Sequence, residues 1–286
     1  MTILNKKIKG IIRLFRPELP FSAGVCVVLG EIVALGSFPS MREAALGFVC
    51  GFFISGSALV SNDYFDLEVD KINAPQRPLP SGMVSPIEAL LLAAVAMLIG
   101  LAASYAVSIP ALILSIVFGA VGILYNWRYK QAGLLGNLMV ASSVGITFIL
   151  GGIAVDQPFN PIVWFFSLTA FLIDFGEEIA GDAMDIEGDK QRDSKSIAIL
   201  RGKKFALRIS GGAFLLVFLI SFIPYFMGWL GLTYLVTICL ANVITLFSTV
   251  KLLRSQTPEE GRKYMRFIYI GATFGMLAYI IAQFFA

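Results

Sequence analysis

Long apolar runs, separated by short charged connections, dominate this sequence and leave few folds open to it. Nine runs are long enough to cross a hydrocarbon core of about 30 Å, and they cover residues 19–37, 44–61, 86–105, 109–127, 134–154, 160–177, 206–224, 229–250 and 265–285. The third and fourth are separated only by Ser108–Pro110. Of the 286 residues, 57% are hydrophobic and only 14% charged, too little polar surface for a soluble globule. The sequence therefore predicts an all-α polytopic membrane protein, a bundle of nine transmembrane helices.

The lysine and arginine residues lie almost entirely in alternate connections. Five precede the first run, two lie in 62–85, two in 128–133, seven in 178–208 and five in 251–266, whereas the other connections hold only Arg42. Positive residues concentrate on the cytoplasmic side of membrane proteins. This distribution predicts an integral cell-membrane protein with a cytoplasmic N-terminus and an external C-terminus. Residues 5–18 are basic and amphipathic, and we expect them to lie on the membrane surface.

A charged motif occurs twice, as D-Y-F-D-L-E-V-D-K at 63–71 and as D-A-M-D-I-E-G-D-K at 182–190. Five residues recur with the same spacing: Asp63, Asp66, Glu68, Asp70 and Lys71 return as Asp182, Asp185, Glu187, Asp189 and Lys190. Each copy follows an apolar run, and four runs separate the two. The pattern predicts one transmembrane domain over 1–286, made of a duplicated four-helix unit (about 19–130 and 134–255) with a ninth helix added.

The spacing of the aspartates indicates a metal site. On a helix, positions 0, +3 and +7 lie along one face, so each motif aims three aspartates the same way and its glutamate elsewhere. Carboxylates near hydrocarbon need compensation by cations, and clusters of oxygen ligands suit Mg²⁺, which also binds phosphates. Both motifs are expected on the cytoplasmic side. We therefore predict that they form one site for Mg²⁺ and a diphosphate.

Basic residues that could bind the diphosphate follow each motif: Lys71 and Arg77 the first, and Lys190, Arg192 and Lys195 the second. Arg77 lies in a loop stiffened by proline, R-P-L-P-S-G at 77–82. The chain has no histidine, so acid–base chemistry would fall to carboxylates, lysine, tyrosine or the substrate. The net charge of +3 is small and indicates no nucleic-acid partner.

Two other classes of protein explain less of the sequence. A cation transporter would account for acidic residues in a membrane, but transporter sites tend to lie near the bilayer midplane between inverted repeats. Here the repeat is parallel, and both motifs lie at one surface. A structural membrane protein would not explain two aspartate faces with lysines between them.

Several motifs together resemble the UbiA-type intramembrane prenyltransferases. N-D-Y-F-D-L-E-V-D at 62–70 is similar to the family signature N-D-x-x-D-x-x-x-D. R-P-L-P-S-G at 77–82, Y-N-W-R-Y-K at 125–130 and D-x-x-x-D at 185–189 follow in the family's order, so the resemblance covers nearly the whole chain. The family's tyrosine-to-lysine spacing is usually four, whereas Tyr125 and Lys130 are five apart.

The resemblance implies a nine-helix bundle and Mg²⁺-dependent transfer of an isoprenyl group from its diphosphate to a lipid-like or aromatic acceptor. It places Asn62, Asp66, Asp70, Asp185 and Asp189 at the family's metal and diphosphate positions, and the internal repeat adds Asp63 and Asp182 as metal ligands. The expected catalytic residues are Asp66, Asp70, Asp185 and Asp189. The expected diphosphate- and substrate-binding residues are Lys71, Arg77, Tyr125, Lys130, Lys190 and Lys195.

Two subgroups of the family share the segments G-D-A-M-D-I-E-G-D-K at 181–190 and S-K-S-I-A-I-L-R-G-K-K at 194–204. One makes archaeal ether lipids, and the other is the homogentisate and chlorophyll group. A-G-L-L-G-N at 132–137 resembles the archaeal subgroup more closely. That resemblance implies geranylgeranyl diphosphate as donor and geranylgeranylglyceryl phosphate as acceptor. An aromatic acceptor (4-hydroxybenzoate, dihydroxynaphthoate or homogentisate) is the alternative.

Overall fold

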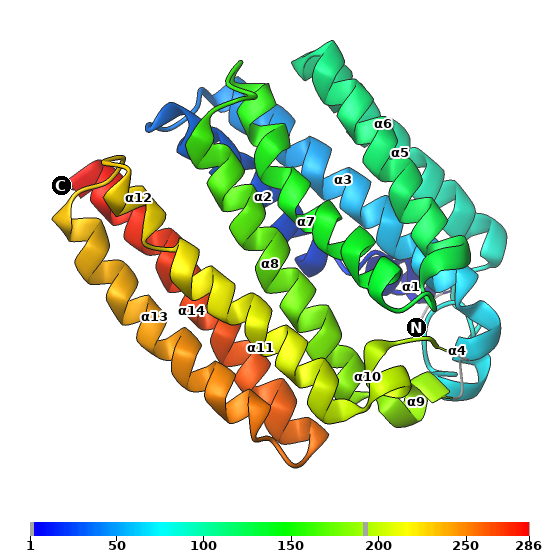
Figure 1. The fold of residues 1–286 in the computed structure, drawn as a ribbon. Coiled ribbons are helices and arrows are strands. Elements are labelled where there is room, and N and C mark those ends of the chain that lie inside the picture. Colours follow the sequence, from blue (N-terminus) through cyan, green and yellow to red (C-terminus); the bar gives the residue numbers. More distant parts are fainter. Residues whose placement is uncertain (1–2, 191–193, 286) are drawn as a thin grey trace. The chain divides into compact units, whose positions relative to one another are not determined.

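The computed structural model describes residues 3–190 and 194–285, and within them every regular element is a helix (Figure 1). The elements are α1 (Ile3–Phe15), α2 (Glu18–Leu35), α3 (Met41–Phe65), α4 (Leu67–Asn73), α5 (Pro86–Val107), α6 (Ile109–Leu124), a π-helical turn (Tyr125–Tyr129), α7 (Leu134–Ala154), α8 (Pro161–Met184), α9 (Ile186–Lys190), α10 (Ile197–Arg201), α11 (Lys203–Ile220), α12 (Ile223–Phe226), α13 (Leu232–Leu253) and α14 (Pro258–Phe285). The predicted all-α class is confirmed.

Eight segments of the described chain are long and apolar enough to cross a membrane: α2, α3, α5, α6 with the π-helical turn, α7, α11 with α12, α13, and α14. The remaining predicted run, 160–177, lies in α8, which has 24 residues. Its second half carries four carboxylates, Asp174, Glu177, Glu178 and Asp182, which set α8 apart from the eight. The count of nine therefore stays a prediction that depends on α8.

Side-chain caps determine where several of these helices begin. Ser40 and Glu43 form a capping box at the start of α3, and Ser85 and Glu88 form another at the start of α5. In each, the serine hydroxyl accepts from the glutamate N–H at 3.3 Å, and the glutamate carboxylate accepts from the serine N–H. Ser108 ends α5 and caps α6. The third and fourth runs are therefore separate helices, as predicted.

The chain divides into two compact units. The first comprises residues 1–128 and 146–164, and the second comprises residues 129–145 and 165–286. This division cuts through α7 and α8 and so differs from the predicted sequence halves, which stay a prediction.

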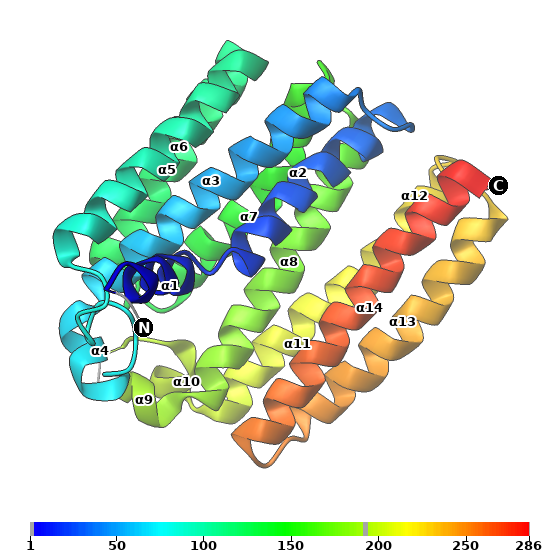
Figure 2. The same ribbon diagram turned by 180° about the vertical axis from the view of Figure 1, so that it is seen from behind.

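In the first unit, α3 packs against both α2 and α5 (Figure 2). Close approach of α2 to α7 depends on Gly30 and Gly151: a Cβ on either would collide with the backbone of the facing helix. Small residues commonly allow transmembrane helices to approach in this way.

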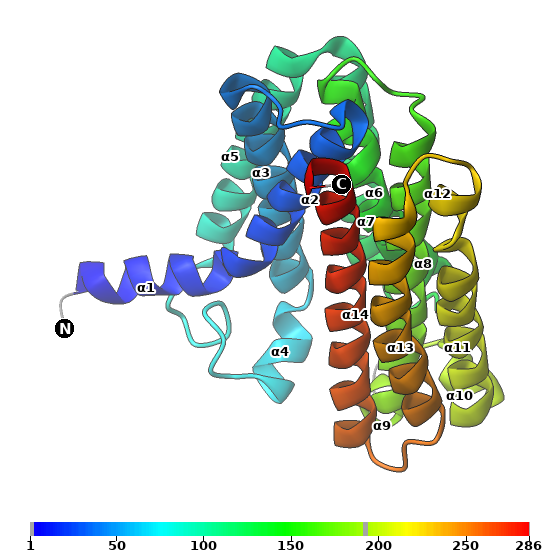
Figure 3. The same ribbon diagram turned by 90° about the vertical axis from the view of Figure 1, so that its left-hand side faces the viewer.

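The short helix α1 turns away from α2 and lies across the ends of the spans of the first unit (Figure 3). Leu14 is fully buried in a cluster with Val60 and Val84. Lys7 forms an ion pair with Glu88 at the start of α5. These contacts hold α1 against the same end of the unit as the first acidic motif.

In the second unit, α8, α10, α11, α13 and α14 share one apolar cluster. Ile179, Phe214 and Leu252 are among its most buried members. The Ser210 hydroxyl on α11 donates to the Gly176 carbonyl on α8 at 2.6 Å, which joins these two helices through a polar contact as well. The second acidic motif lies at the end of this cluster, where α8 ends.

Candidate functional site

The first motif lies where α3 gives way to α4. Asp63 is in the last turn of α3, Asp66 links the two helices, and Asp70 is on α4. Arg77 approaches Asp70 at 2.6 Å and Asp63 at 3.9 Å, and it also attracts Asp66. Glu68 is exposed and pairs with Lys71 at 2.7 Å instead. The three aspartates thus gather around one cation, while the glutamate points elsewhere.

Two arginines balance the buried carboxylates of this motif. Asp63 and Asp70 are almost completely buried, and Asp63 forms an ion pair with Arg16 as well as with Arg77. Partial burial alone would lower the pKa of the Arg77 guanidinium. Its hydrogen bond with Asp70 and its attraction to Asp63 and Asp66 outweigh that effect and raise this pKa above its ordinary value. Arg77 therefore remains charged at any physiological pH.

Asparagine side chains hold the neighbouring part of the first unit. The Asn62 amide donates to Asn126 Oδ1 at 2.9 Å, and the Asn126 amide donates to the Ala58 carbonyl at 3.0 Å. Asn126 belongs to the π-helical turn that starts at Tyr125. A π-helical turn takes up one residue more than an α-helical turn, which accounts physically for the five-residue spacing between Tyr125 and Lys130.

The second motif repeats the local structure of the first. α8 ends at Met184, Asp185 forms the link, and α9 begins at Ile186. Each of these positions is 119 residues beyond its counterpart in the α3–α4 link. Lys190 pairs with Glu187 at 3.7 Å, as Lys71 pairs with Glu68. The duplicated sequence therefore folds twice into the same helix–link–helix arrangement.

The first aspartates of the two motifs have different partners. Where Asp63 is paired with Arg16, its counterpart Asp182 accepts a hydrogen bond of 3.0 Å from the Asn137 amide. Asn137 is buried on α7 and closes the A-G-L-L-G-N segment. Its role was missed from the sequence, although it lies in a segment that resembles the archaeal subgroup. Arg192 lies outside the described residues.

The turn before α7 holds the segment that follows the second motif. The Lys195 N–H donates to the Gln131 carbonyl at 2.9 Å. Gly133 has a φ of +61°, and a Cβ there would collide with the Lys195 backbone. Only glycine meets both conditions without strain.

We predict that Gly133→Ala lowers the free energy of unfolding by at least about 1–2 kcal/mol, because alanine is strained at positive φ and its Cβ would displace Lys195. Thermal unfolding in detergent measures the effect. Gly212→Ala is the control, since a Cβ on this helical glycine would meet no neighbouring atom within 4 Å and alanine is the better helix former. Equal unfolding midpoints for Gly133→Ala and wild type would contradict this description of the turn.

Further carboxylates continue the acidic face of α8 toward the interior of the second unit. Asp174 is buried and its Oδ2 has no hydrogen-bond partner among the described residues. Glu177 accepts a hydrogen bond from the Tyr269 hydroxyl on α14, and Glu178 is attracted by Lys130. These residues were missed from the sequence. Two acidic residues within the apolar run 160–177, followed directly by Glu178, would have been the signal.

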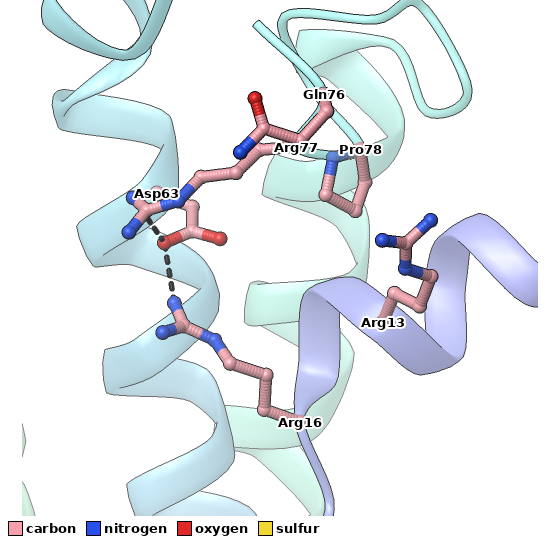
Figure 4. A pocket seen from close by; sticks show the side chains of 6 residues that line it. All are labelled: Arg13, Arg16, Asp63, Gln76, Arg77 and Pro78. Carbon is pink, nitrogen blue, oxygen red and sulfur yellow. Dashed lines mark hydrogen bonds and ion pairs between the residues drawn. The ribbon is translucent and has the colours of Figure 1, made fainter. Parts of the chain in front are cut away.

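A basic pocket lies beside the first motif (Figure 4). It has a volume of about 170 Å³ and is lined by Arg13, Arg16, Asp63, Gln76, Arg77 and Pro78. Arg16 and Arg77 approach Asp63 from opposite sides, and Arg13 extends from α1 (Figure 4). Of the three arginines, only Arg77 was predicted from the sequence.

The carboxylates of the two motifs suit a magnesium ion that takes part of its ligands from a bound diphosphate. Within residues 3–190 and 194–285, no group of three acidic, cysteine or histidine side chains could hold a metal ion unaided. Mg²⁺ commonly takes only one or two carboxylates and completes its shell with water and phosphate oxygens. The oxygen-only donors at Asp66 and Asp185 suit that mode, in which a bound diphosphate supplies the missing ligands.

Comparisons with known proteins agree with the resemblance seen in the motifs. The UbiA prenyltransferase family matches residues 23–271. The chain is 34% identical to digeranylgeranylglyceryl phosphate synthase of Thermococcus kodakarensis over 96% of its own length and 98% of that protein. A solved structure concerned with digeranylgeranylglyceryl phosphate synthase is 30% identical, has a TM-score of 0.82, and covers 97% of this chain and 98% of its own.

A more distant solved structure shares the fold. A UbiA homologue from Archaeoglobus fulgidus, bound to DMAPP and Mg²⁺, is 18% identical, with a TM-score of 0.66 over 96% of this chain and 98% of its own.

Proposed function

Because the chain belongs to the UbiA prenyltransferase family, we propose that it transfers a geranylgeranyl group from geranylgeranyl diphosphate to the hydroxyl of geranylgeranylglyceryl phosphate. The reaction would form an ether bond and release diphosphate. One observation carries this choice of substrates: 34% identity to an archaeal digeranylgeranylglyceryl phosphate synthase over nearly both full lengths. The duplicated aspartate motif supports the same reaction, since it provides oxygen ligands for a metal-bound diphosphate.

We assign the two motifs to one active site on the cytoplasmic side. The asymmetric distribution of basic residues supports this sidedness, and it also places the C-terminus outside. Asp66, Asp70, Asp185 and Asp189 would hold magnesium and the diphosphate, supported by Asn62, Asp63 and Asp182. Bound magnesium would neutralise negative charge on the diphosphate and favour its departure.

The basic residues near the motifs would bind the diphosphate directly. Arg77 is the best candidate for this role. A guanidinium has five N–H donors, and the contacts of Arg77 with Asp63 and Asp70 involve only one nitrogen, Nη1, so other donors remain for the diphosphate. Lys71 and Lys190 are exposed beside the motifs, and among the described residues they pair only with neighbouring glutamates. Tyr125, Lys130 and Lys195 complete the proposed set.

Turnover by the purified protein in detergent tests the proposal. With geranylgeranyl diphosphate as donor, we expect ether-linked product from geranylgeranylglyceryl phosphate and none from 4-hydroxybenzoate, dihydroxynaphthoate or homogentisate. Chelation of divalent metal should abolish turnover, and added Mg²⁺ should restore it, because the motif carboxylates need a cation between them and the diphosphate. Turnover of an aromatic acceptor alone would replace this proposal with quinone-precursor prenylation.

A further inference from the structure

We propose that the basic pocket beside the first motif binds the phosphate group of the lipid acceptor, with Arg13 as a specificity-determining residue. This inference rests on the proposed function, because it concerns how the second substrate of that reaction is recognised. Both the acceptor and a bilayer lipid carry a phosphate that such a pocket could bind, and we assign the pocket to the acceptor. The pocket residues are Arg13, Arg16, Asp63, Gln76, Arg77 and Pro78.

One of the arginines that line the pocket takes no part in its ion pairs. Its lining holds three arginines and one carboxylate, Asp63. Asp63 and Asp70 together can balance only two of the three arginines. Arg13 is exposed and makes no hydrogen bond or ion pair with another described residue. The Arg13 guanidinium is therefore available to an anion.

Hydrogen-bond donors in the pocket also remain unused. Arg16 bonds Asp63 through Nη2, while its buried Nε has no partner among the described residues. A buried donor without an acceptor costs free energy, and phosphate oxygens are acceptors that arginine binds well. The cavity of about 170 Å³ has the liquid volume of about five or six water molecules. A phosphate group, with five heavy atoms, fits that space.

The backbone at Arg16 is itself strained. Arg16 has a φ of +48°, a left-handed conformation that is unfavourable for a residue other than glycine. It lies between α1 and α2, directly before Pro17. The strained turn brings the guanidinium to Asp63 and the pocket. Strain of this kind concentrates at functional sites, so it supports a binding role for the turn.

The position of α1 favours a lipid as the ligand. Ile8, Ile11 and Ile12 are exposed, with 48%, 36% and 55% of their surface accessible. They lie on a helix whose other side packs through Leu14 onto the first unit. Exposed isoleucines with basic neighbours are typical of helices that lie in the membrane interface. Arg13 on this helix would reach phosphates at the level of lipid headgroups.

The pocket also lies where the reaction requires the acceptor. Arg77 lines the pocket and approaches Asp70 of the first motif at 2.6 Å. In the proposed acceptor, the reacting hydroxyl is on the glycerol carbon next to the one that bears the phosphate. A phosphate held in the pocket would therefore bring the hydroxyl beside the motif that we assign to the donor diphosphate.

Steady-state kinetics of Arg13→Gln test the assignment. We expect the acceptor KM to rise about tenfold, the loss of one exposed charge-assisted hydrogen bond, with the donor KM and kcat unchanged. The preference for phosphorylated over dephosphorylated acceptor should fall by the same factor. Because Arg13 has no partner within the described chain, its loss should not disturb folding. Lys9→Gln, on the same helix but outside the pocket, should behave as wild type, and Arg13→Lys should recover part of the affinity.

Three outcomes would overturn the inference. An unchanged acceptor KM in Arg13→Gln would show that the pocket does not bind the acceptor. A raised donor KM would assign the pocket to the diphosphate. In nanodiscs, a changed response to phosphatidate with an unchanged acceptor KM would assign it to bilayer headgroups. All three outcomes require that the wild-type protein transfers the prenyl group. If the wild-type protein shows no transfer, that result would contradict the proposed function instead.

Discussion

Asp66→Ala and Asp185→Ala are each expected to reduce kcat by a hundredfold or more, the scale on which loss of one electrostatic group at a reacting centre slows an enzyme. The two residues occupy equivalent links, α3–α4 and α8–α9, 119 residues apart. Each would contribute a carboxylate to the metal-bound diphosphate. Equal loss from both variants would also support our assignment of the two motifs to one site.

The fold should survive both changes. Without Asp66, the ion pairs of Arg16 with Asp63 and of Arg77 with Asp70 remain, and one of three like charges is removed. Glu68→Ala and Glu187→Ala are matched controls, because each glutamate lies two residues after the substituted aspartate of its motif. Their side chains are 80% and 91% exposed. Circular dichroism that shows intact helices would assign a loss of turnover to the site and not to unfolding. Near-wild-type turnover of either aspartate variant at saturating Mg²⁺ would exclude that residue as a ligand.

The features that were best predicted from the sequence depend on local periodicity. Apolar runs became helices. The serine caps at 40, 85 and 108, where each hydroxyl accepts from the N–H three residues later, are equally local but were not predicted. The repeat at 63–71 and 182–190 became a repeated helix–link–helix structure, since the same spacing of charged residues follows an apolar helix in both places. What periodicity did not predict is the break at Asp66 and Asp185.

Long-range pairing was the part that could not be predicted. Arg16 reaches Asp63 across 47 residues, and this contact requires α1 to fold back over the end of α3. Charge on α1 was explained adequately by membrane attraction alone, so nothing in the sequence separated Arg13 and Arg16 from the lysines nearby. Similarly, the bond of Asn137 to Asp182 depends on α7 packing beside α8, which no local pattern encodes.

Fluorine at C2 of the donor, next to the allylic carbon that reacts, is expected to slow turnover by roughly a hundredfold, which corresponds to ~2.7 kcal/mol of barrier. The chain has no histidine, and a glycerol hydroxyl is a weak nucleophile. Departure of the diphosphate should therefore precede attack, leaving positive charge on the allylic carbon that fluorine destabilises. Arg77, with Lys71 and Lys190, would stabilise the negative charge that develops on the leaving group.

The hydroxyl proton would then leave late, to a carboxylate, to the released diphosphate or to the acceptor's own phosphate. The donor KM should hardly change, because fluorine is small and the diphosphate contacts are untouched. Comparing kcat and KM for the fluorinated and natural donors at fixed Mg²⁺ separates the two effects. An unchanged kcat would mean that the hydroxyl attacks before the diphosphate departs. In that case Arg77 and the aspartates would still bind the diphosphate, but they would no longer be needed to stabilise it ahead of bond formation.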